Sequence, residues 1–563
     1  MFGLHIADII VLIVYLVGII FLGIWAARLV RTMGDFFMPR RFGKGLLVTH
    51  AFGTGTHSDQ AVSVASKTYT TGLSGIWYQW LWLFATPFYW LIAPIMRRFR
   101  AITMADVFEA RYSQSVAMLF AAVGMASLMV SIGVMLKGSG AVVAASFGDT
   151  VSPNLIIAVM TVMFLLYGMA GGLSAAILTD FIQGILTVIF SFVLLPFVLD
   201  AVGGISGLRQ TITDEQMFSL VAPAEVGVFY IAIIALNGLI GIVTQPHTMG
   251  NCAAGRTEGD GRFGFVVGSF IKRLCTMAWS LTGLAAVAYY AGHDVDPDHV
   301  YGLMAREFLP SILPGLLGIF LAALLASLMS SCDSFMIASS ALFTENVYKP
   351  LKPDADEGHY LTVGRLASLG VVAGGVLFAF WLPDVVAGLE IFWKIPPMMG
   401  LAFWLGLFWR RATVAGAWAA TLAALFAWWL STTGWFIGLA GTLSPAFVFA
   451  KGGGTEIYLP WQMVFYLVMG LVVGIVVSLV TRPVAEEKLE RFYELVRTPV
   501  EEGEPPALQP CTIPQSIVIP PKRLVFPNSS LEFQVPGRDA VLGFAVSWGL
   551  VGSLIYGFYA ITR

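Results

Sequence analysis

Long apolar runs, separated by short polar or charged breaks, fill almost the entire chain. Many of them reach the roughly 20 residues that a helix needs to cross the hydrocarbon core of a bilayer. A soluble core could not bury so many, so the pattern predicts an all-α integral membrane protein. Taking each run between its charged or Pro/Gly-rich breaks predicts about 14 spanning helices, at 5–29, 45–69, 74–96, 115–146, 153–172, 175–200, 227–249, 262–291, 313–346, 361–382, 386–409, 412–433, 459–481 and 540–561.

The loops between these predicted spans alternate in basic content. Clusters such as Arg97-Arg98 and Arg410-Arg411 follow odd-numbered spans, whereas the intervening loops are neutral or acidic, as at Asp214. By the positive-inside rule, the basic loops face the cytoplasm. The alternation therefore predicts a multi-pass protein of the cell membrane with both termini outside.

The one long polar stretch, residues 482–539, falls on the predicted cytoplasmic side. Its first part, 484–496, has the charge and periodicity of an amphipathic surface helix, and the rest resembles an extended linker. The predicted division of the chain is a first helix with its basic loop (1–44), a set of five helices (45–201), an extracellular loop (202–226), a second set of five (227–409), two accessory helices (410–481), the cytoplasmic tail (482–539) and a last helix (540–563).

The second predicted span contains eight consecutive small or polar residues, 53–60, near its middle. Unpaired polar backbone is costly in hydrocarbon, so function is expected where a spanning helix turns polar. Gly53 and Gly55 allow the helix to unwind, and unwound carbonyls can ligate a cation. A tight turn between two short interfacial helices is the alternative interpretation.

The seventh span has a second break, from Asn237 to His247. Pro246 lacks an N–H and clashes with the preceding turn, so free carbonyls are expected there as well. Each break opens a set of five predicted spans, and an odd number of spans gives the two sets opposite orientations. Paired interrupted segments in two halves indicate an inverted-repeat transporter with a site at the membrane midplane.

The ninth span carries four serines on one helical face. They follow the i, i+3, i+4, i+7 rule, and Asp333 lies among them. A single membrane serine usually bonds its own helix or a neighbour, but four with an acid favour a hard-cation site. Asp180 is a second acid within reach, with a structural helix cap as its alternative role. The four serines are Ser327, Ser330, Ser331 and Ser334.

Two buried basic positions need partners. Lys272, in the middle of the eighth span, has no acid nearby in the sequence and is a candidate for the solute side. Glu390 and Lys394 stand at i and i+4 in the eleventh span, where they can neutralise each other as a structural ion pair.

Composition excludes other classes of protein. The chain is 57% hydrophobic and 12% charged, with a mean hydropathy of +0.80, and its net charge of −2 gives no basic excess for nucleic acid. Its four cysteines lack disulfide or metal spacing. No His/Cys/acid cluster, nucleotide loop or cofactor motif suggests an enzyme.

Five motifs in order along the chain resemble the sodium:solute symporter family, which includes the sodium–glucose and sodium–proline symporters. The resemblance implies a LeuT-type core of ten helices in a 5+5 inverted repeat, with one helix before it and three after, and Na⁺ as the coupling ion with no organic cofactor. The motifs are Thr103 to Tyr112, Gly171-Gly172-Leu173 through Thr179-Asp180-Phe181-Ile182-Gln183, Gln245-Pro246-His247, Met329-Ser330-Ser331 with Glu345-Asn346-Val347-Tyr348-Lys349, and Gly406-Leu407-Phe408-Trp409-Arg410-Arg411.

Carried over by this resemblance, the main sodium site would use backbone carbonyls and serine hydroxyls from the second and ninth spans. The carbonyls are those of Gly53, Thr56 and Ser327, and the hydroxyls those of Ser330 and Ser331. A second Na⁺ or H⁺ site, as in some members, would use Asp180, Asp333 and Ser334. Asp333 stands where those members have a hydroxyl.

The resemblance also implies a solute site. Its sugar-branch positions fall on Gln60, Gln79, Asn237 and Lys272, while the gating tyrosine of that branch is Ile240 here. Further candidate contacts are His57, Asp59, Gln245 and Glu390.

The predicted function is sodium-coupled import of a small polar organic solute, a sugar, polyol or carboxylate, by alternating access. An amino-acid symporter of the proline type is the alternative, and a solute sensor or ion channel on the same fold is an alternative of another class. The expected partners are the solute and the lipid bilayer, without an obligate protein partner.

Overall fold

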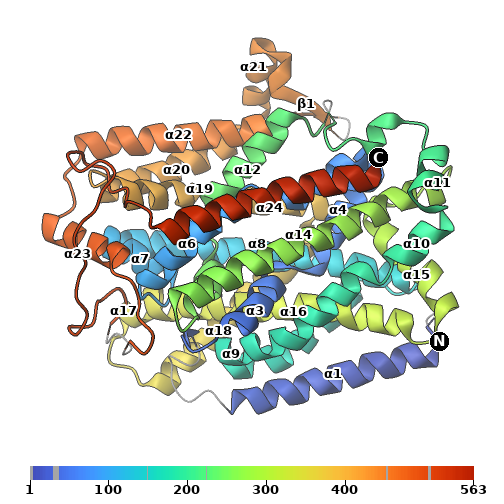
Figure 1. Cartoon of the computed structure of the whole chain (residues 1–563), viewed down its shortest axis with the longest axis horizontal. Coiled ribbons are helices and arrows are strands. Elements are labelled where there is room, and N and C mark those ends of the chain that lie inside the picture. The colour runs from blue at the N-terminus through green and yellow to red at the C-terminus, as the bar shows by residue number, and fades with distance from the viewer. Residues whose placement is uncertain (1–3, 29–36, 149, 223–224, 452–453, 505–508) are drawn as a thin grey trace.

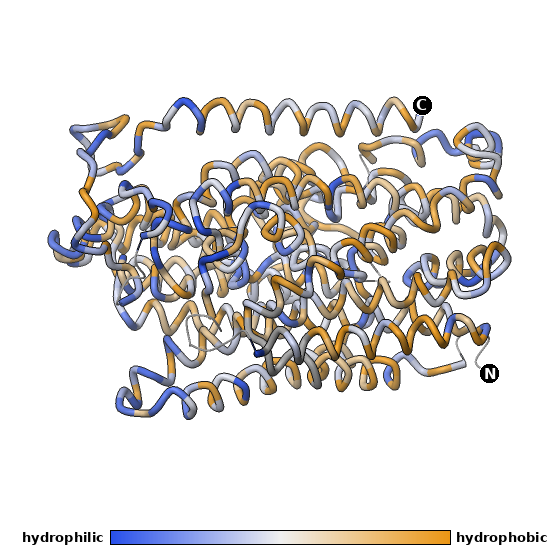
Figure 2. Tube along the Cα trace, turned by 60° about the horizontal axis from the view of Figure 1, so that its bottom comes forward, coloured by the Kyte–Doolittle hydropathy of each residue, from blue (hydrophilic) through white to orange (hydrophobic). Residues whose placement is uncertain are grey.

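The computed structural model describes residues 4–28, 37–148, 150–222, 225–451, 454–504 and 509–563. In this part of the chain, helices dominate, and one hairpin of β1 (Val448–Lys451) and β2 (Gly454–Ile457) is the only sheet. The helices lie side by side along the long axis of the molecule (Figure 1). Apolar residues cover much of their length, and hydrophilic stretches gather most at the end that holds the tail (Figure 2).

Seven helical stretches among the described residues are long and apolar enough to cross a membrane, or up to nine if two bent pairs each count as one span. The prediction of a multi-pass helical membrane protein is therefore confirmed, whereas the count of 14 spans stays a prediction. The seven are Gln114–Ser146, Ala176–Ala201, Leu316–Leu351, Glu357–Trp381, Val385–Phe408, Leu459–Val480 and Arg538–Thr562.

The first half of the chain contains the earlier of the two predicted helix breaks. The predicted span 45–69 is observed as two helices that end and begin on either side of Thr56-His57, and the span 74–96 is divided into three short pieces. The elements are α1 (Ile6–Ala27), α3 (Lys44–Gly55), α4 (Ser58–Thr71), η1 (Gly72–Ile76), α5 (Trp77–Trp80), α6 (Thr86–Arg98), α7 (Met104–Arg111) and α8 (Gln114–Ser146).

The predicted spans 153–172 and 175–200 fall in one helix, α9 (Pro153–Phe192), followed by α10 (Leu195–Ala201). A straight helix of 40 residues would be about 60 Å long, twice the thickness of the hydrocarbon core.

Contacts at the two ends of α9 show that it is not straight. Tyr301 donates a hydrogen bond to the carbonyl of Phe190, near the end of α9 (3.1 Å). The adjacent Gly302 packs against α8. The same part of α8 contacts Ile157, near the start of α9. Both ends therefore lie at the same end of the molecule, so the chain reverses direction within α9, as two successive spans require.

The second half contains the other predicted break. Helices α12 (Val228–Ile242) and α13 (Pro246–Ala253) are bent by 69° relative to each other. The elements that follow are α14 (Glu258–Tyr289), η3 (Pro297–His299), α15 (Val300–Ile312), α16 (Leu316–Phe343), the π-helical η4 (Thr344–Tyr348), α17 (Lys349–Leu351), α18 (Glu357–Trp381) and α19 (Val385–Phe408).

Glycines bring α14 into direct contact with α3. A methyl group added at Gly264 would lie 2.6 Å from the Cβ of Leu47, and one added at Gly268 would lie 2.8 Å from the carbonyl of Val48. Membrane helices associate through such close approach, because lipid is as apolar as the side chains and supplies no hydrophobic drive. Helices α3 and α14 therefore form one tightly packed unit.

The region after α19 contains structure that hydrophobic periodicity did not predict. Helix α20 (Val414–Leu430) is followed by α21 (Gly434–Leu443), bent from it by 83°, then η5 (Pro445–Phe447) and the hairpin, before α22 (Leu459–Val480). Short helices also occupy the loop before α12, namely α11 (Gly204–Thr211) and η2 (Glu215–Phe218).

The predicted amphipathic helix of the tail is present as α23 (Glu486–Arg497), and the last predicted span is α24 (Arg538–Thr562). Helix α23 lies at the opposite end of the molecule from the start of α1 and from the C-terminus (Figure 1). It packs on the core through Tyr493, which donates to the carbonyl of Gly406 at 2.9 Å.

The segment after α23 is fastened to the end of α6 by a buried ion pair. Arg100 donates from Nε and Nη2 to the carboxylate of Glu504 at 2.6 and 2.8 Å, and also to the carbonyls of Thr498 and Pro499. The side chains of Arg100 and Glu504 are 0% and 6% exposed. Breaking such a pair leaves an uncompensated buried charge.

We expect Arg100→Ala to lower the free energy of unfolding by about 3–5 kcal/mol, because it leaves the buried carboxylate of Glu504 without its charged partner. Thermal unfolding in detergent measures the change. Arg491→Ala is the control, since Arg491 and its partner Glu487 are 75% and 78% exposed and such pairs contribute about 0–1 kcal/mol. Equal melting temperatures for the two variants would contradict the assignment of the tail as a docked element.

Candidate functional site

The break between α3 and α4 exposes a row of backbone carbonyls inside the helix bundle. Helix α3 ends at Gly55, and Thr56 and His57 are extended (φ −128°, ψ 106° and φ −129°, ψ 159°) before α4 begins at Ser58. The last carbonyls of a helix lack partners within it and form the negative end of its dipole. The carbonyl of Gly53 accepts from the N–H of Thr56 at 3.3 Å, and further partners of these carbonyls come from other elements.

Helix α16 supplies one such partner. The Ser331 hydroxyl lies 3.1 Å from the carbonyl oxygen of Gly53 and 3.3 Å from that of Thr54. It also lies 3.3 Å from the carbonyl of Ser327, one turn back on its own helix. All these residues are buried. Four oxygens from two helices therefore converge at the break, and protein carbonyls and hydroxyls of this kind replace the hydration shell of an alkali cation.

Thr56, whose carbonyl is also predicted as a ligand of the main sodium site, is fully buried beside the break. Its own hydroxyl has no hydrogen-bond partner among the described residues.

Ser330 is joined to Asp180 on α9 and, through that carboxylate, to His50 on α3. Its hydroxyl donates to Oδ1 of Asp180 on α9 at 2.5 Å, and Oδ2 of the same carboxylate lies 2.5 Å from Nδ1 of His50 on α3. His50 was not predicted as a site residue. Helical spacing places it one turn before Gly53, and this is the signal in the sequence that could have identified it.

A second polar contact joins α3 to α16 nearby. The Thr54 hydroxyl lies 3.0 Å from that of Ser334 and 3.3 Å from Nδ1 of His50. Asp333 is buried on α16 next to Ser334. The residues predicted for the two cation sites are thus neighbours along the α3–α16 contact.

The other side of the break gathers four of the nine predicted solute residues around the carbonyl of Gly55. Lys272 on α14 donates to this oxygen, as does Nε2 of Gln60 at 3.2 Å. The Lys272 ammonium also lies 5.4 Å from the centre of the Trp82 ring, a cation–π contact. His57 is bonded to Asp59 and to Gln60, so four predicted residues form one connected group.

Three other predicted solute residues have different surroundings. The Gln79 side chain is fully buried and neither of its polar atoms has a hydrogen-bond partner among the described residues. Asn237 donates to the carbonyl of Trp393 at 2.9 Å and accepts from Tyr466, so its amide ties α12 to α19 and α22. Ile240 packs against Gly400 of α19.

The two remaining candidates, Gln245 and Glu390, belong to other parts of the structure than α4 and α14. Gln245 is the buried residue that precedes α13. Glu390 accepts a hydrogen bond from Tyr78 at 2.9 Å and lines a cavity of about 530 Å³ between the core, the accessory helices and the hairpin. Lys67, paired with Glu225 at 3.0 Å, lines the same cavity.

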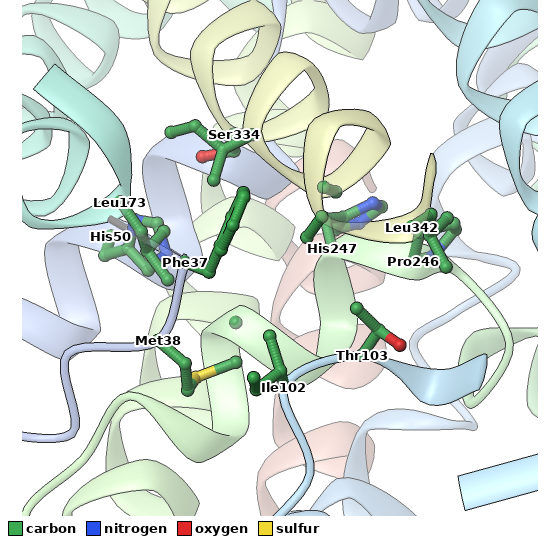
Figure 3. A pocket seen from close by; sticks show the side chains of 14 residues that line it. Phe37, Met38, His50, Ile102, Thr103, Leu173, Pro246, His247, Ser334 and Leu342 are labelled. Atoms are coloured by element: carbon green, nitrogen blue, oxygen red, sulfur yellow. The ribbon is translucent and has the colours of Figure 1, made fainter. Parts of the chain in front are cut away.

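A much smaller cavity, of about 30 Å³, lies on the other side of the break. Figure 3 shows Ser334, His50, Phe37 and His247 around it, with Met38, Ile102 and Thr103 facing them. Ile102 and Thr103 belong to the segment between α6 and α7, at the end of the molecule that holds the tail. Of these two cavities, the one beside the hairpin is therefore much the larger.

Comparison with known proteins gives consistent matches over most of the chain. The model of the "Sodium:solute symporter family" matches residues 40–424. The sodium/pantothenate symporter of Escherichia coli (strain K12) is 25% identical over 439 residues, which are 73% of this chain and 87% of that protein. The osmoregulated proline transporter of Bacillus subtilis (strain 168) is 26% identical over 450 residues, 74% of this chain and 88% of that one.

Solved structures share the fold. A Na⁺-coupled sialic acid symporter, in a substrate-bound outward-open state, superposes with a TM-score of 0.70 at 18% identity, covering 85% of this chain and 98% of that one. A nucleobase-cation-symport-1 family transporter gives a TM-score of 0.53 at 10% identity, over 83% and 99%. The predicted LeuT-type fold is confirmed.

We expect Gly53→Ala to weaken Na⁺ binding by about 10-fold or more, as displacement of the groups around a metal site does. The reason is steric: the added methyl group would lie 2.7 Å from the Ser330 hydroxyl. The Na⁺ concentration that half-maximally raises the melting temperature of the purified protein measures this. Gly55→Ala is the matched control, because a methyl group there has nothing within 4 Å. If the two variants need the same Na⁺ concentration for half of the rise in melting temperature, the predicted sodium site at Gly53 is contradicted.

Proposed function

Because the chain belongs to the sodium:solute symporter family, we propose that it uses a Na⁺ gradient to import a small polar organic solute by alternating access. The solute is a sugar, a polyol or a carboxylate, with an amino acid as the alternative. Membership of this family makes the protein a multi-pass membrane transporter that couples to Na⁺, and not an enzyme. Relatives that bear the names of pantothenate, proline and myo-inositol transporters support a polar organic solute without selecting one.

The observation that carries the proposal is the convergence of oxygens on Ser331 at the α3–α4 break. We assign the main Na⁺ site to the carbonyls of Gly53, Thr56 and Ser327 with the hydroxyls of Ser330 and Ser331. The site draws its ligands from a broken helix and from a neighbouring helix, so bound Na⁺ fixes one relative to the other. Each Na⁺ that enters down 100 mV supplies about 2.3 kcal/mol.

We assign the solute site to the opposite side of the same break, around Gln60, Gln79 and Lys272. Two observations support this position. Lys272 makes no ion pair with any residue that the structure describes. Oε1 of Gln60 and both polar side-chain atoms of Gln79 are buried and have no hydrogen-bond partner among the described residues. Buried polar atoms left unpaired are costly, and a polar solute would satisfy them.

The two cavities support a direction for the transport cycle. The larger cavity, beside Lys67, gives the solute an approach from the hairpin end, and the smaller one, beside Phe37, is the exit toward the tail end. With the basic loops inside, the hairpin end and both termini are extracellular and the tail is cytoplasmic. Residues 45–201 and 227–409 are the two inverted repeats in this proposal.

We expect Ser331→Ala to abolish most of the Na⁺ dependence of uptake, because it removes the hydroxyl that touches three carbonyls. Uptake of radiolabelled solutes into proteoliposomes, with Na⁺, Li⁺ or H⁺ gradients, tests this. Ser327→Ala is the control: among the residues that the structure describes, its hydroxyl bonds only the carbonyl of Leu324 on its own helix at 2.8 Å, and the substitution keeps the carbonyl of Ser327. Wild-type uptake that ignores Na⁺ would refute the function itself.

We expect Lys272→Met to raise the KM for the solute by about 10-fold or more, because a hydrogen bond to a charged group contributes about 1.5–3 kcal/mol. A panel of sugars, polyols, carboxylates and amino acids first identifies the solute. Lys67→Met, the same change at an ion-paired lysine of the outer cavity, should alter KM little, since partly exposed pairs are weak. Equal effects at both positions would argue against a solute role for Lys272.

A further inference from the structure

Three buried side chains form a line from α3 through α9 to α16, directly beside the oxygens of the break. His50, Asp180 and Ser330 are 1%, 0% and 0% exposed. The contacts between them, His50 Nδ1 to Asp180 Oδ2 and Asp180 Oδ1 to Ser330 Oγ, are both 2.5 Å. These two contacts hold the hydroxyl of Ser330 in one orientation.

The orientation of the Ser330 hydroxyl decides whether it can ligate a cation. A serine hydroxyl has one hydrogen to donate and two lone pairs that accept. Because Ser330 donates its hydrogen to Asp180, its lone pairs are left for other partners. The Ser330 oxygen lies only 2.7 Å from the position that a methyl group on Gly53 would take, so it is in contact with the backbone whose carbonyls form the break.

Asp180 can orient Ser330 only if its own carboxylate is held in place. A fully buried carboxylate needs hydrogen-bonded partners, and a carboxylate only accepts, so Nδ1 of His50 carries the hydrogen between them. Thr54 closes the arrangement, since its hydroxyl approaches both His50 and Ser334. Helices α3, α9 and α16 are thereby joined in a ring of polar contacts around one end of the main site.

We propose that His50 and Asp180 are positioning residues for the main Na⁺ site, which hold the Ser330 hydroxyl with its lone pairs toward the ion. The inference rests on the proposed function, because it requires Na⁺ at the α3–α16 contact. It gives Asp180 a different role from that of a ligand to a second cation. Residues that orient metal ligands typically change metal affinity by 10–100-fold when they are altered.

The test is Na⁺ binding to the purified full-length protein, measured in two ways. Equilibrium binding of ²²Na⁺ gives the number of ions bound, and Na⁺ titration of intrinsic tryptophan fluorescence gives the half-saturating concentration. We expect His50→Ala to raise that concentration by about 10–100-fold without changing the number of ions bound. His50→Asn should recover most of the affinity, because its amide N–H can replace Nδ1–H.

Two further variants separate positioning from general damage. His50→Gln has a volume closer to that of histidine, but its amide matches Nε2 and not Nδ1, so it should lose affinity as His50→Ala does, even if the alanine variant folds poorly. His247→Ala is the control: His247 lines the same small cavity and stacks on Phe335 with ring centres 4.7 Å apart, and Na⁺ affinity should not change.

Two results would overturn the proposal while leaving the proposed function intact. One is wild-type Na⁺ affinity in folded His50→Gln. The other is the loss of exactly one of two bound ions in Asp180→Asn, with the remaining ion bound as tightly as before, since Asp180 would then be a ligand of a second site. A wild-type protein that binds no Na⁺ would refute both the function and this inference.

Discussion

The carbonyl groups left free where α3 ends are the feature on which the rest of the structure depends. Inside a membrane, backbone groups without partners are expensive. The carbonyls of this break are satisfied partly by nearby residues, since Thr56 N–H donates to Gly53 and Gln60 donates to Gly55, and partly by other helices. Ser331 of α16 reaches the carbonyls of Gly53 and Thr54, and Lys272 of α14 reaches that of Gly55. The close approach of α14 at Gly264 and Gly268 then makes structural sense, because it brings the lysine to the carbonyl.

This arrangement puts the two proposed sites two residues apart on one backbone segment. The proposed cation uses the carbonyl of Gly53, and the proposed solute lies beside that of Gly55. An ion that pulls on the first carbonyl alters the segment that carries the second, so binding of one ligand changes the affinity for the other by the same factor in both directions. Coupling of ion to solute therefore needs no long pathway through the protein, because both ligands would bind at the same short break between α3 and α4.

The sequence predicted the polar segments of this arrangement better than it predicted which helices those segments contact. A polar run at residues 53–60 and four serines on one face are local patterns, so the break and the α16 surface could be found from spacing alone. The amide of Asn237, which stays a predicted solute contact, bonds to Trp393 and Tyr466, and His50 was not predicted as a site residue. Periodicity reports which face of a helix is polar, whereas these two roles depend on which distant helix that face meets.

The tail constrains how the tail end of the molecule can open. Helix α23 is fixed to α19 through Tyr493 and Gly406, whereas the segment that follows it is fixed to α6 by the buried Arg100–Glu504 pair. Neither attachment is a weak surface contact, so neither is expected to separate in each cycle. Helix α23 is also held by the end of α6, since Arg98 donates to the carbonyl of Val496 at 3.2 Å and Phe99 stacks on Phe492 with ring centres 5.7 Å apart. The tail therefore ties α19 to the end of α6 at more than one point, and any movement between these two helices has to act against these contacts.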